Sequence, residues 1–294
     1  MHSFHPYSFR PLAVLLALGT VFALTAPGRA QTPAPVSPTR VSPVPVSPAP
    51  SDSSAPALDL LPLKKALRPL SGGGPIQSKS NFQMTGSKQG LSFTFREEAH
   101  IIAKRPGRFR AELTQFSADN APQQRLLVVS NGATVWTYRP GTRQYSVTSF
   151  KAFEAANNDV TALGLAVGGF FLGDGHQLGQ GFQGLTKSNS AEVLSALAGL
   201  GVVLSSKMQS GNNEDDLTYR MTLTKQGLTY QFLVNSASSA LRQIELIGAQ
   251  KGVKIAFKEK ITQLVPLTMV PRDTFTFTPP PGAAKVTTLS VDPF

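Results

Sequence analysis

Side chains that could act as nucleophiles or metal ligands are scarce in this sequence. It contains no cysteine, which excludes a thiol nucleophile and a thiolate metal site. Beyond residue 30 the histidines are His100 and His176, which lie far apart and have no metal-ligand pattern around them. Neither a G-x-S-x-G nucleophile elbow nor a Walker A motif occurs. We therefore expect no catalytic residue, no metal and no cofactor.

Two further patterns could suggest chemistry but lack the geometry for it. The acidic pairs 97–98 and 215–216 are adjacent residues, and neighbours on a strand point to opposite faces, so they are poor acid–base partners. Residues 179–184 match G-x-G-x-x-G, but a dinucleotide site needs this motif inside a βαβ unit, and the surroundings are antiparallel. A flexible loop is the favoured interpretation. An enzyme that uses scattered carboxylates stays the least favoured of three classes of function.

The N-terminus is organised like a secretory signal peptide. A basic region with Arg10 precedes an apolar run over residues 12–24, and small residues at 28 and 30 predict cleavage before Gln31. The apolar run is shorter than the roughly 20 residues of a membrane-spanning helix. We predict that residues 1–30 are a cleaved signal peptide and that the mature protein is periplasmic. A retained anchor is the alternative.

The next segment, residues 31–56, is predicted to be a Pro-rich disordered linker. Its Val-Ser-Pro triplet recurs at a five-residue step, at 36–38, 41–43 and 46–48. Proline fixes φ and lacks a backbone donor, so this segment cannot build helix or sheet. The folded domain is expected to span residues 57–294.

The composition of the chain suits a folded domain with anionic partners. Hydrophobic residues make up 41% and charged residues 15%, and 18 phenylalanines suit an apolar core or cavity. The formal charge is +11, and about +9 is kept after loss of the signal. Such a surplus favours lipid head groups. The basic residues are scattered without interleaved aromatics, so we expect no nucleic-acid partner.

Period-two alternation predicts strands on both sides of an apolar helical insert. A short helix over residues 57–67, interrupted by Pro62, is expected first. The predicted strands cover residues 91–95, 101–104, 109–113, 126–130, 135–138 and 144–148, and then 217–223, 230–234, 244–246 and 253–257. The predicted insert comprises a helix over 150–157, the apolar run 160–172, a Gly-rich stretch over 173–184 and a helix over 191–200. This order favours an α+β fold, with one antiparallel sheet and helices on one side.

Three motifs in order resemble the outer-membrane lipoprotein carrier family, the LolA-like periplasmic proteins. The first is Lys-Arg-Pro-Gly-Arg-Phe within residues 104–112. The second is a strand and turn over 127–132 followed by Val-Trp-Thr-Tyr at 135–138. The third is Phe-Thr-Phe-Thr-Pro-Pro-Pro-Gly at 275–282. The resemblance implies a strongly curved antiparallel sheet, an incomplete barrel, whose concave face is closed by helices over an apolar cavity for acyl chains.

The resemblance also implies ligand-binding roles for Arg105, Phe109 and Trp136. The apolar run 160–172 adds Phe170, Phe171 and Leu172 as ligand-binding candidates. Arg105 would contact a helical lid formed by residues 160–172 and help it to open and close; a surface arginine before a turn is the alternative. Core packing is the alternative for Phe109 and Trp136. The lid does not follow the family closely, and a buried hairpin without a gating role stays open for it.

The sequence thus favours a periplasmic carrier that shields acyl chains of lipoproteins or other lipids in an apolar cavity. It would act as a monomer, without a cofactor, and could meet partner proteins of the inner and outer membranes. The alternative is a tethered periplasmic sensor or interaction module with the same fold that regulates an envelope partner.

Overall fold

The computed structural model describes most of the chain after the predicted linker. The described residues are 58–88, 91–117, 120–156, 158–172, 189–199, 202–210, 215–224, 227–250 and 253–291. The predicted signal peptide (1–30), the linker (31–56) and the motif at 179–184 lie outside these residues and stay predictions.

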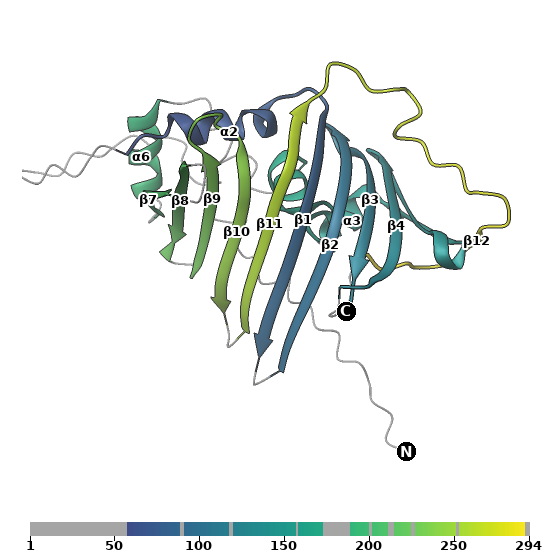
Figure 1. Cartoon of the computed structure of the whole chain (residues 1–294). Helices are drawn as coiled ribbons and strands as arrows, with labels where there is room; N and C mark the ends of the chain where they lie inside the picture. The colour runs from purple at the N-terminus through teal and green to yellow at the C-terminus, as the bar shows by residue number, and fades with distance from the viewer. Residues whose placement is uncertain are drawn as a thin grey trace, which may run out of the picture.

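One open, strongly curved sheet dominates the described residues (Figure 1). Its twelve described strands are β1 (Ile76–Lys88), β2 (Leu91–Lys104), β3 (Arg108–Phe116), β4 (Pro122–Asn131), β5 (Thr134–Arg139), β6 (Gln144–Ser149), β7 (Val202–Ser210), β8 (Asp215–Leu223), β9 (Leu228–Asn235), β10 (Leu241–Gln250), β11 (Val253–Pro266) and β12 (Ala284–Lys285). Their order is β12-β6-β5-β4-β3-β2-β1-β11-β10-β9-β8-β7, which does not close on itself. Only the short pair of β12 with β6 is parallel among these strands. The predicted α+β fold, an incomplete antiparallel barrel, is confirmed.

The strands alternate because one face of the sheet is buried. We call this the inner face; on β9 it carries Tyr230 and Phe232, whose neighbours in sequence are half-buried. The two predicted strands 91–95 and 101–104 are a single strand, β2. The prediction divided it because Glu97, a charged residue, occupies a buried inner-face position and breaks the apolar alternation.

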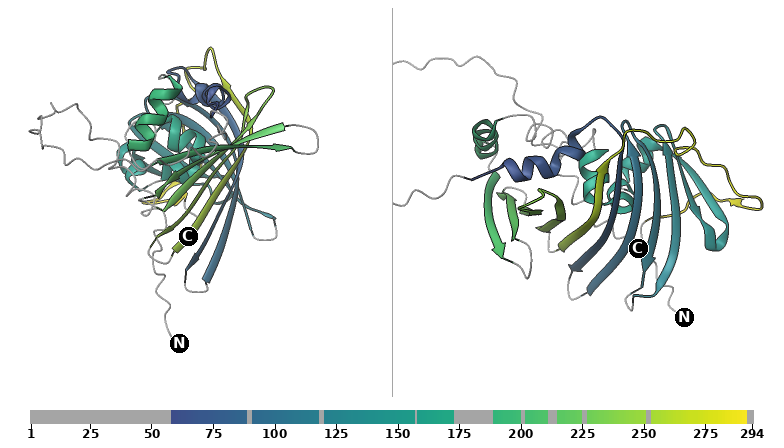
Figure 2. Two further views of the ribbon diagram at one scale, coloured as in Figure 1. Left: turned by 90° about the vertical axis from the view of Figure 1, so that its left-hand side faces the viewer. Right: turned by 45° about the horizontal axis from the view of Figure 1, so that its top comes forward.

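The helices lie against the inner face (Figure 2). They are α2 (Leu61–Ser71), α3 (Phe150–Ala155), α4 (Asn158–Leu163), the π-helix η3 (Gly164–Phe171) and α6 (Ser190–Gly199), and a 3-10 turn, η2, covers Pro140–Thr142. The prediction that Pro62 interrupts the first helix is wrong. Pro62 lies in the first turn of α2, where a backbone N–H has no intrahelical partner, so proline costs no hydrogen bond there.

The segment after β11 returns along the sheet to its far edge. Phe277 packs against Trp136, with ring centroids 6.4 Å apart, and β12 then pairs with β6. The Val291 side chain is buried in the core, and the Val291 carbonyl accepts a hydrogen bond of 3.1 Å from the Gln115 side chain. Residues 267–291 therefore reach from the outer surface of the sheet to its buried side.

Candidate functional site

The apolar run 160–172, which we call the lid, covers the centre of the inner face. It comprises the end of α4, the π-helix η3 and Leu172, and every residue of η3 is buried. The Leu172 N–H donates to the Val167 carbonyl at 2.8 Å, the five-residue step of a π-helix. A helix that is apolar all round is stable only when it is buried on all sides. The predicted apolar run 160–172 of the insert is thus confirmed as helical, with a π-helical form that the sequence did not reveal, while the predicted Gly-rich stretch 173–184 lies outside the described residues.

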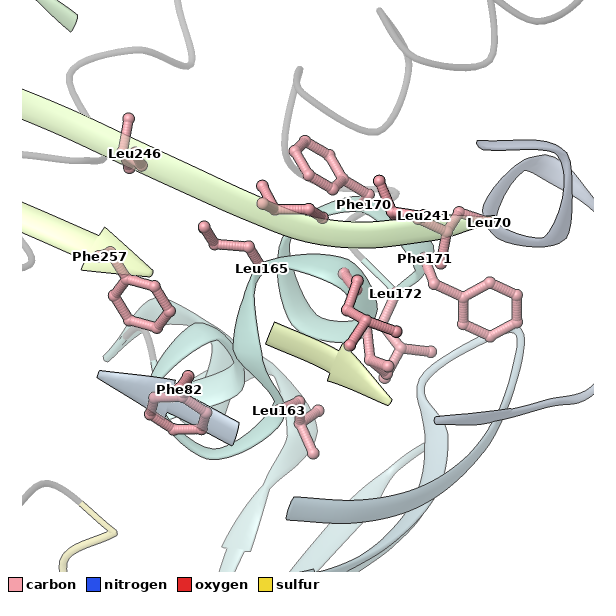
Figure 3. Packing of buried hydrophobic residues seen from close by; sticks show 14 of the residues in the cluster. Leu70, Phe82, Leu163, Leu165, Phe170, Phe171, Leu172, Leu241, Leu246 and Phe257 are labelled. Atoms are coloured by element: carbon pink, nitrogen blue, oxygen red, sulfur yellow. The ribbon is translucent and has the colours of Figure 1, made fainter. Parts of the chain in front are cut away.

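Lid side chains fill the space against the sheet (Figure 3). The Phe170 ring lies 6.3 Å from the Tyr230 ring and 6.1 Å from the Phe232 ring, both on β9. Leu165 points toward Phe257 of β11. An apolar guest on the inner face would need the places that these side chains take.

Arg105, in the turn between β2 and β3, holds the C-terminal end of the lid. Its guanidinium donates to the carbonyls of Phe171, Phe170 (3.2 Å) and Leu70 (3.2 Å), and it lies 5.0 Å from the centre of the Phe171 ring. The last carbonyls of a helix have no intrahelical donor, and the planar guanidinium supplies several donors at once. Because Leu70 belongs to α2, Arg105 ties α2 and the lid to the rim of the sheet.

A buried carboxyl group, Glu259 of β11, holds the N-terminal turn of η3, in the middle of the lid. Its Oε2 accepts the Ala166 N–H at 2.9 Å, and the side chain is fully buried. Burial raises the pKa of Glu259 to about 7, against the smaller lowering effect of its hydrogen bonds. Gly164 has φ +69°, and a Cβ added there would lie 2.6 Å from Glu259 Oε1. Only glycine therefore leaves room for this carboxyl group.

A second buried carboxyl group lies two strands away on the same row of the inner face. Glu97 and Glu259 both pair in register with Phe82, one from each side. Glu97 accepts a hydrogen bond of 2.9 Å from Gln115, and burial raises its pKa well above the usual value. Its neighbour Glu98 is exposed, so the prediction that this acidic pair faces opposite ways is confirmed.

The structure brings most of the predicted ligand-binding residues to the lid and its surroundings. Phe170, Phe171 and Leu172 belong to the lid, and Arg105 contacts it. Phe109 is fully buried on the inner face, where its ring lies 5.8 Å from that of Phe153 on α3.

Trp136 does not join this group. On β5 it faces the side opposite to its buried neighbours Val135 and Thr137, and it packs against Phe277. The period-two alternation of β5 places Trp136 on the outer face, so its prediction as a ligand-binding residue is corrected to a packing role. Motif resemblance located its strand but not its face.

Sequence reasoning missed Glu259, Glu97 and Gly164. A signal for the first was present: Ile255, Phe257 and Ile261 are buried at a two-residue step, and Glu259 falls on the same step. A charged residue in phase with buried apolar residues predicts a buried carboxyl group. No comparable signal marks Gly164, because its partner is distant in sequence.

The outer face carries a different kind of surface. A groove of about 620 Å³ crosses β1 to β4, and polar or charged residues such as Lys79, His100, Glu112 and Arg125 line it. His100 is hydrogen bonded to Gln77 at 2.8 Å. Within the described ranges no group of three or more His, Asp or Glu side chains is placed to hold a metal ion. Such a groove does not suit acyl chains, so the inner face is the candidate site.

The helices of the described ranges are all too short or too polar to cross a membrane.

Comparison with known proteins finds matches at the level of fold. No protein-family model and no curated protein matches the sequence. One match is an uncharacterized conserved protein from Thermus thermophilus, with a TM-score of 0.36 and 9% sequence identity. The match covers 77% of this chain and 99% of the Thermus chain. A second match, LprF from Mycobacterium bovis, has a TM-score of 0.36 and 10% sequence identity and covers 72% of this chain and 95% of LprF. A third match, a LolA superfamily protein from Nitrosomonas europaea, has a TM-score of 0.27 and 13% sequence identity and covers 73% of this chain and 97% of that protein.

Identities of 9–13% and TM-scores of 0.27–0.36 do not establish a shared function. The function of this chain has to be derived from its own contacts.

Proposed function

We propose that this protein is a non-enzymatic lipid carrier of the bacterial periplasm that holds acyl chains between the lid and the inner face of the sheet. The observation that supports this proposal is the way in which the lid is attached. The apolar π-helix η3 of the lid covers a largely apolar face, and Glu259 and Arg105 contact its N-terminal turn and its C-terminal end.

Such a lid can exchange one apolar surface for another. When it moves, the aromatic side chains of the inner face, among them Phe82, Tyr230 and Phe257, lose their cover. Exposed apolar area costs roughly 25 cal/mol per Å² in water, so an acyl chain that takes the place of the lid side chains is stabilised. Gly168 and Gly169 each lower helix stability by about 1 kcal/mol, which eases rearrangement of the lid.

Arg105 is the residue that we expect to control this exchange. Its hydrogen bonds to the Phe170 and Phe171 carbonyls tie the lid to the rim of the sheet, and together they contribute about 2 kcal/mol to closure. Partner proteins of the membranes would load and receive the lipid. The basic character of the chain suits anionic head groups near such partners.

Native mass spectrometry with lipid extraction tests the proposal on protein purified from its host. We expect a mass excess that resolves into diacyl or triacyl species. It should fall strongly in Phe171→Asp, which places a charge in the buried lid, and less in Phe171→Ala. Met269→Asp is the matched control because Met269 is 81% exposed. A ligand-free protein that takes up no fluorescent fatty acid would contradict the proposal and favour the sensor or interaction module.

A further inference from the structure

Glu259 has little that compensates for its charge in the structure. Its Oε1 has no hydrogen-bond partner and Oε2 accepts the Ala166 N–H, while weaker contacts with the Leu165 N–H and the Ser80 hydroxyl lower its pKa by less than burial raises it. An ionised carboxylate that is buried without a cation is costly, and binding a proton relieves the cost.

The groups that face Glu259 do not supply a positive charge. The lid has no charged residue, and the buried side of α2 consists of Leu63, Ala66, Leu67 and Leu70. On the neighbouring strands, β1 places Ser80 and Phe82 on the inner face, and β10 places Ile244 opposite Glu259. Glu97 on β2, Tyr230 on β9 and Tyr219 on β8 are the buried titratable side chains on this face of the described strands, and they are neutral or negative. Arg139, in phase with the inner face of β5, lies five strands away from β11 in the sheet.

We infer that Glu259 is a proton-dependent anchor of the lid, which closes firmly when this carboxyl group is protonated and opens more readily when it is ionised. This inference concerns the regulation of the proposed lipid site and rests on the proposed function. Opening of the lid admits water to the inner face, and water solvates the carboxylate that the closed lid leaves without a cation. The protonated acid loses nothing by burial and still accepts the Ala166 N–H through its carbonyl oxygen.

The direction of the pH effect follows from the same geometry. Burial in the closed form raises the pKa of Glu259 to about 7, whereas a solvated glutamate titrates near its usual 4.5. The closed form therefore binds the proton more tightly than the open form. As pH rises from 5 to 8, the ratio of closed to open lid should fall, by up to ~70-fold if opening solvates the group completely.

The absence of cysteine makes the lid directly observable. Cysteines introduced at Val160, in the lid, and at Lys260, on the exposed side of β11, can carry a pair of nitroxide labels in the full-length protein. Pulsed electron paramagnetic resonance then gives the distance between them at pH 5 and pH 8, in protein freed of lipid. We expect one short distance at pH 5 and a growing second, longer distance at pH 8.

Substitution of the two buried acids separates the anchor from its surroundings. Glu259→Gln should keep the short distance at both pH values, because the amide stays neutral and can accept the Ala166 N–H. Glu97→Gln is the matched control: it removes a buried acid on the same row of the sheet and should keep the pH response of the lid. Glu259→Met replaces the amide variant if that variant does not fold.

The inference would be overturned if the distance between the two labels did not change with pH in the parent protein, or if it still changed with pH in Glu259→Gln. Both measurements use lipid-free protein, so they do not depend on lipid binding. A lid that responds to pH in a protein without lipid affinity would contradict the proposed function alone. A lipid-binding protein whose lid ignores pH would contradict this inference alone.

Discussion

The two ends of η3, the π-helix of the lid, are held to the same sheet by opposite chemistries. At the C-terminal end, the guanidinium of Arg105 donates to carbonyls of Phe170, Phe171 and Leu70. At the N-terminal end, the carboxyl group of Glu259 accepts the backbone N–H of Ala166. Each anchor matches the partial charge of its helix end, because helix N-termini are positive and C-termini negative.

The difference lies in how the two anchors respond to conditions. An arginine keeps its charge at every physiological pH, so its contacts stay the same as pH changes. Glu259 is fully buried and changes protonation near neutral pH. One end of η3 is therefore a constant attachment, whereas the other depends on protons.

The largest effect is expected where the N-terminal anchor is blocked sterically. Gly164→Ala would bring a methyl group to 2.6 Å from Glu259 Oε1 at a positive φ, and we expect a loss of about 3–4 kcal/mol in the free energy of unfolding. Urea denaturation measures it. Gly169→Ala is the control within the same helix, because an added Cβ there meets nothing closer than 4.0 Å. Equal losses in both variants would show that Gly164 has no special role.

A smaller effect is expected from the protons of Glu259. Its pKa is about 7 in the folded protein and near 4.5 unfolded, so the folded state binds more protons between these values. The resulting stabilisation is complete below pH 4.5 and is lost as pH rises through 7, a change of about 3 kcal/mol. Protonation of Glu97 changes the free energy of unfolding in the same direction. The test is therefore to measure this free energy by urea denaturation from pH 4 to 8 in the parent protein and in Glu259→Gln, and to take the difference. Parallel pH profiles would contradict the prediction.

The C-terminal anchor should contribute about 2 kcal/mol without a dependence on pH. Arg105→Ala leaves the carbonyls of Phe170 and Phe171 without this donor, and Arg105→Lys should lose part of that amount because an ammonium cannot span both helices. Denaturation of both variants at pH 5 and pH 8 measures the loss. A loss that changes between the two pH values would remove the contrast between the ends of η3.

The smallest effect is expected away from both anchors. Trp136 lies on the outer face. We expect Trp136→Phe to lower the free energy of unfolding by about 1 kcal/mol, because it weakens the contact with Phe277, and to leave lipid binding unchanged. Fluorescent fatty-acid titration compares this variant with Phe171→Ala. Weaker binding in Trp136→Phe would place the ligand on the outer face instead.

Much of this architecture could be predicted from local patterns. Alternation at a period of two identifies strands such as β8 and β9, and the uninterrupted apolar run 160–172 predicts a buried helix. The motif around Arg105 indicated a residue that contacts the lid, and its hydrogen bonds confirm that contact. Whether these residues bind lipid is still a prediction.

The rest depended on contacts between residues that are distant in sequence. Glu259 meets Ala166 across 93 positions, and Trp136 meets Phe277 only because the C-terminal segment returns to β5. The sequence by itself determined most of the strands and the apolar run of the lid. Which face each residue occupies, and which buried charge meets which helix end, was decided by the tertiary structure, because register and curvature bring together groups that no local pattern connects.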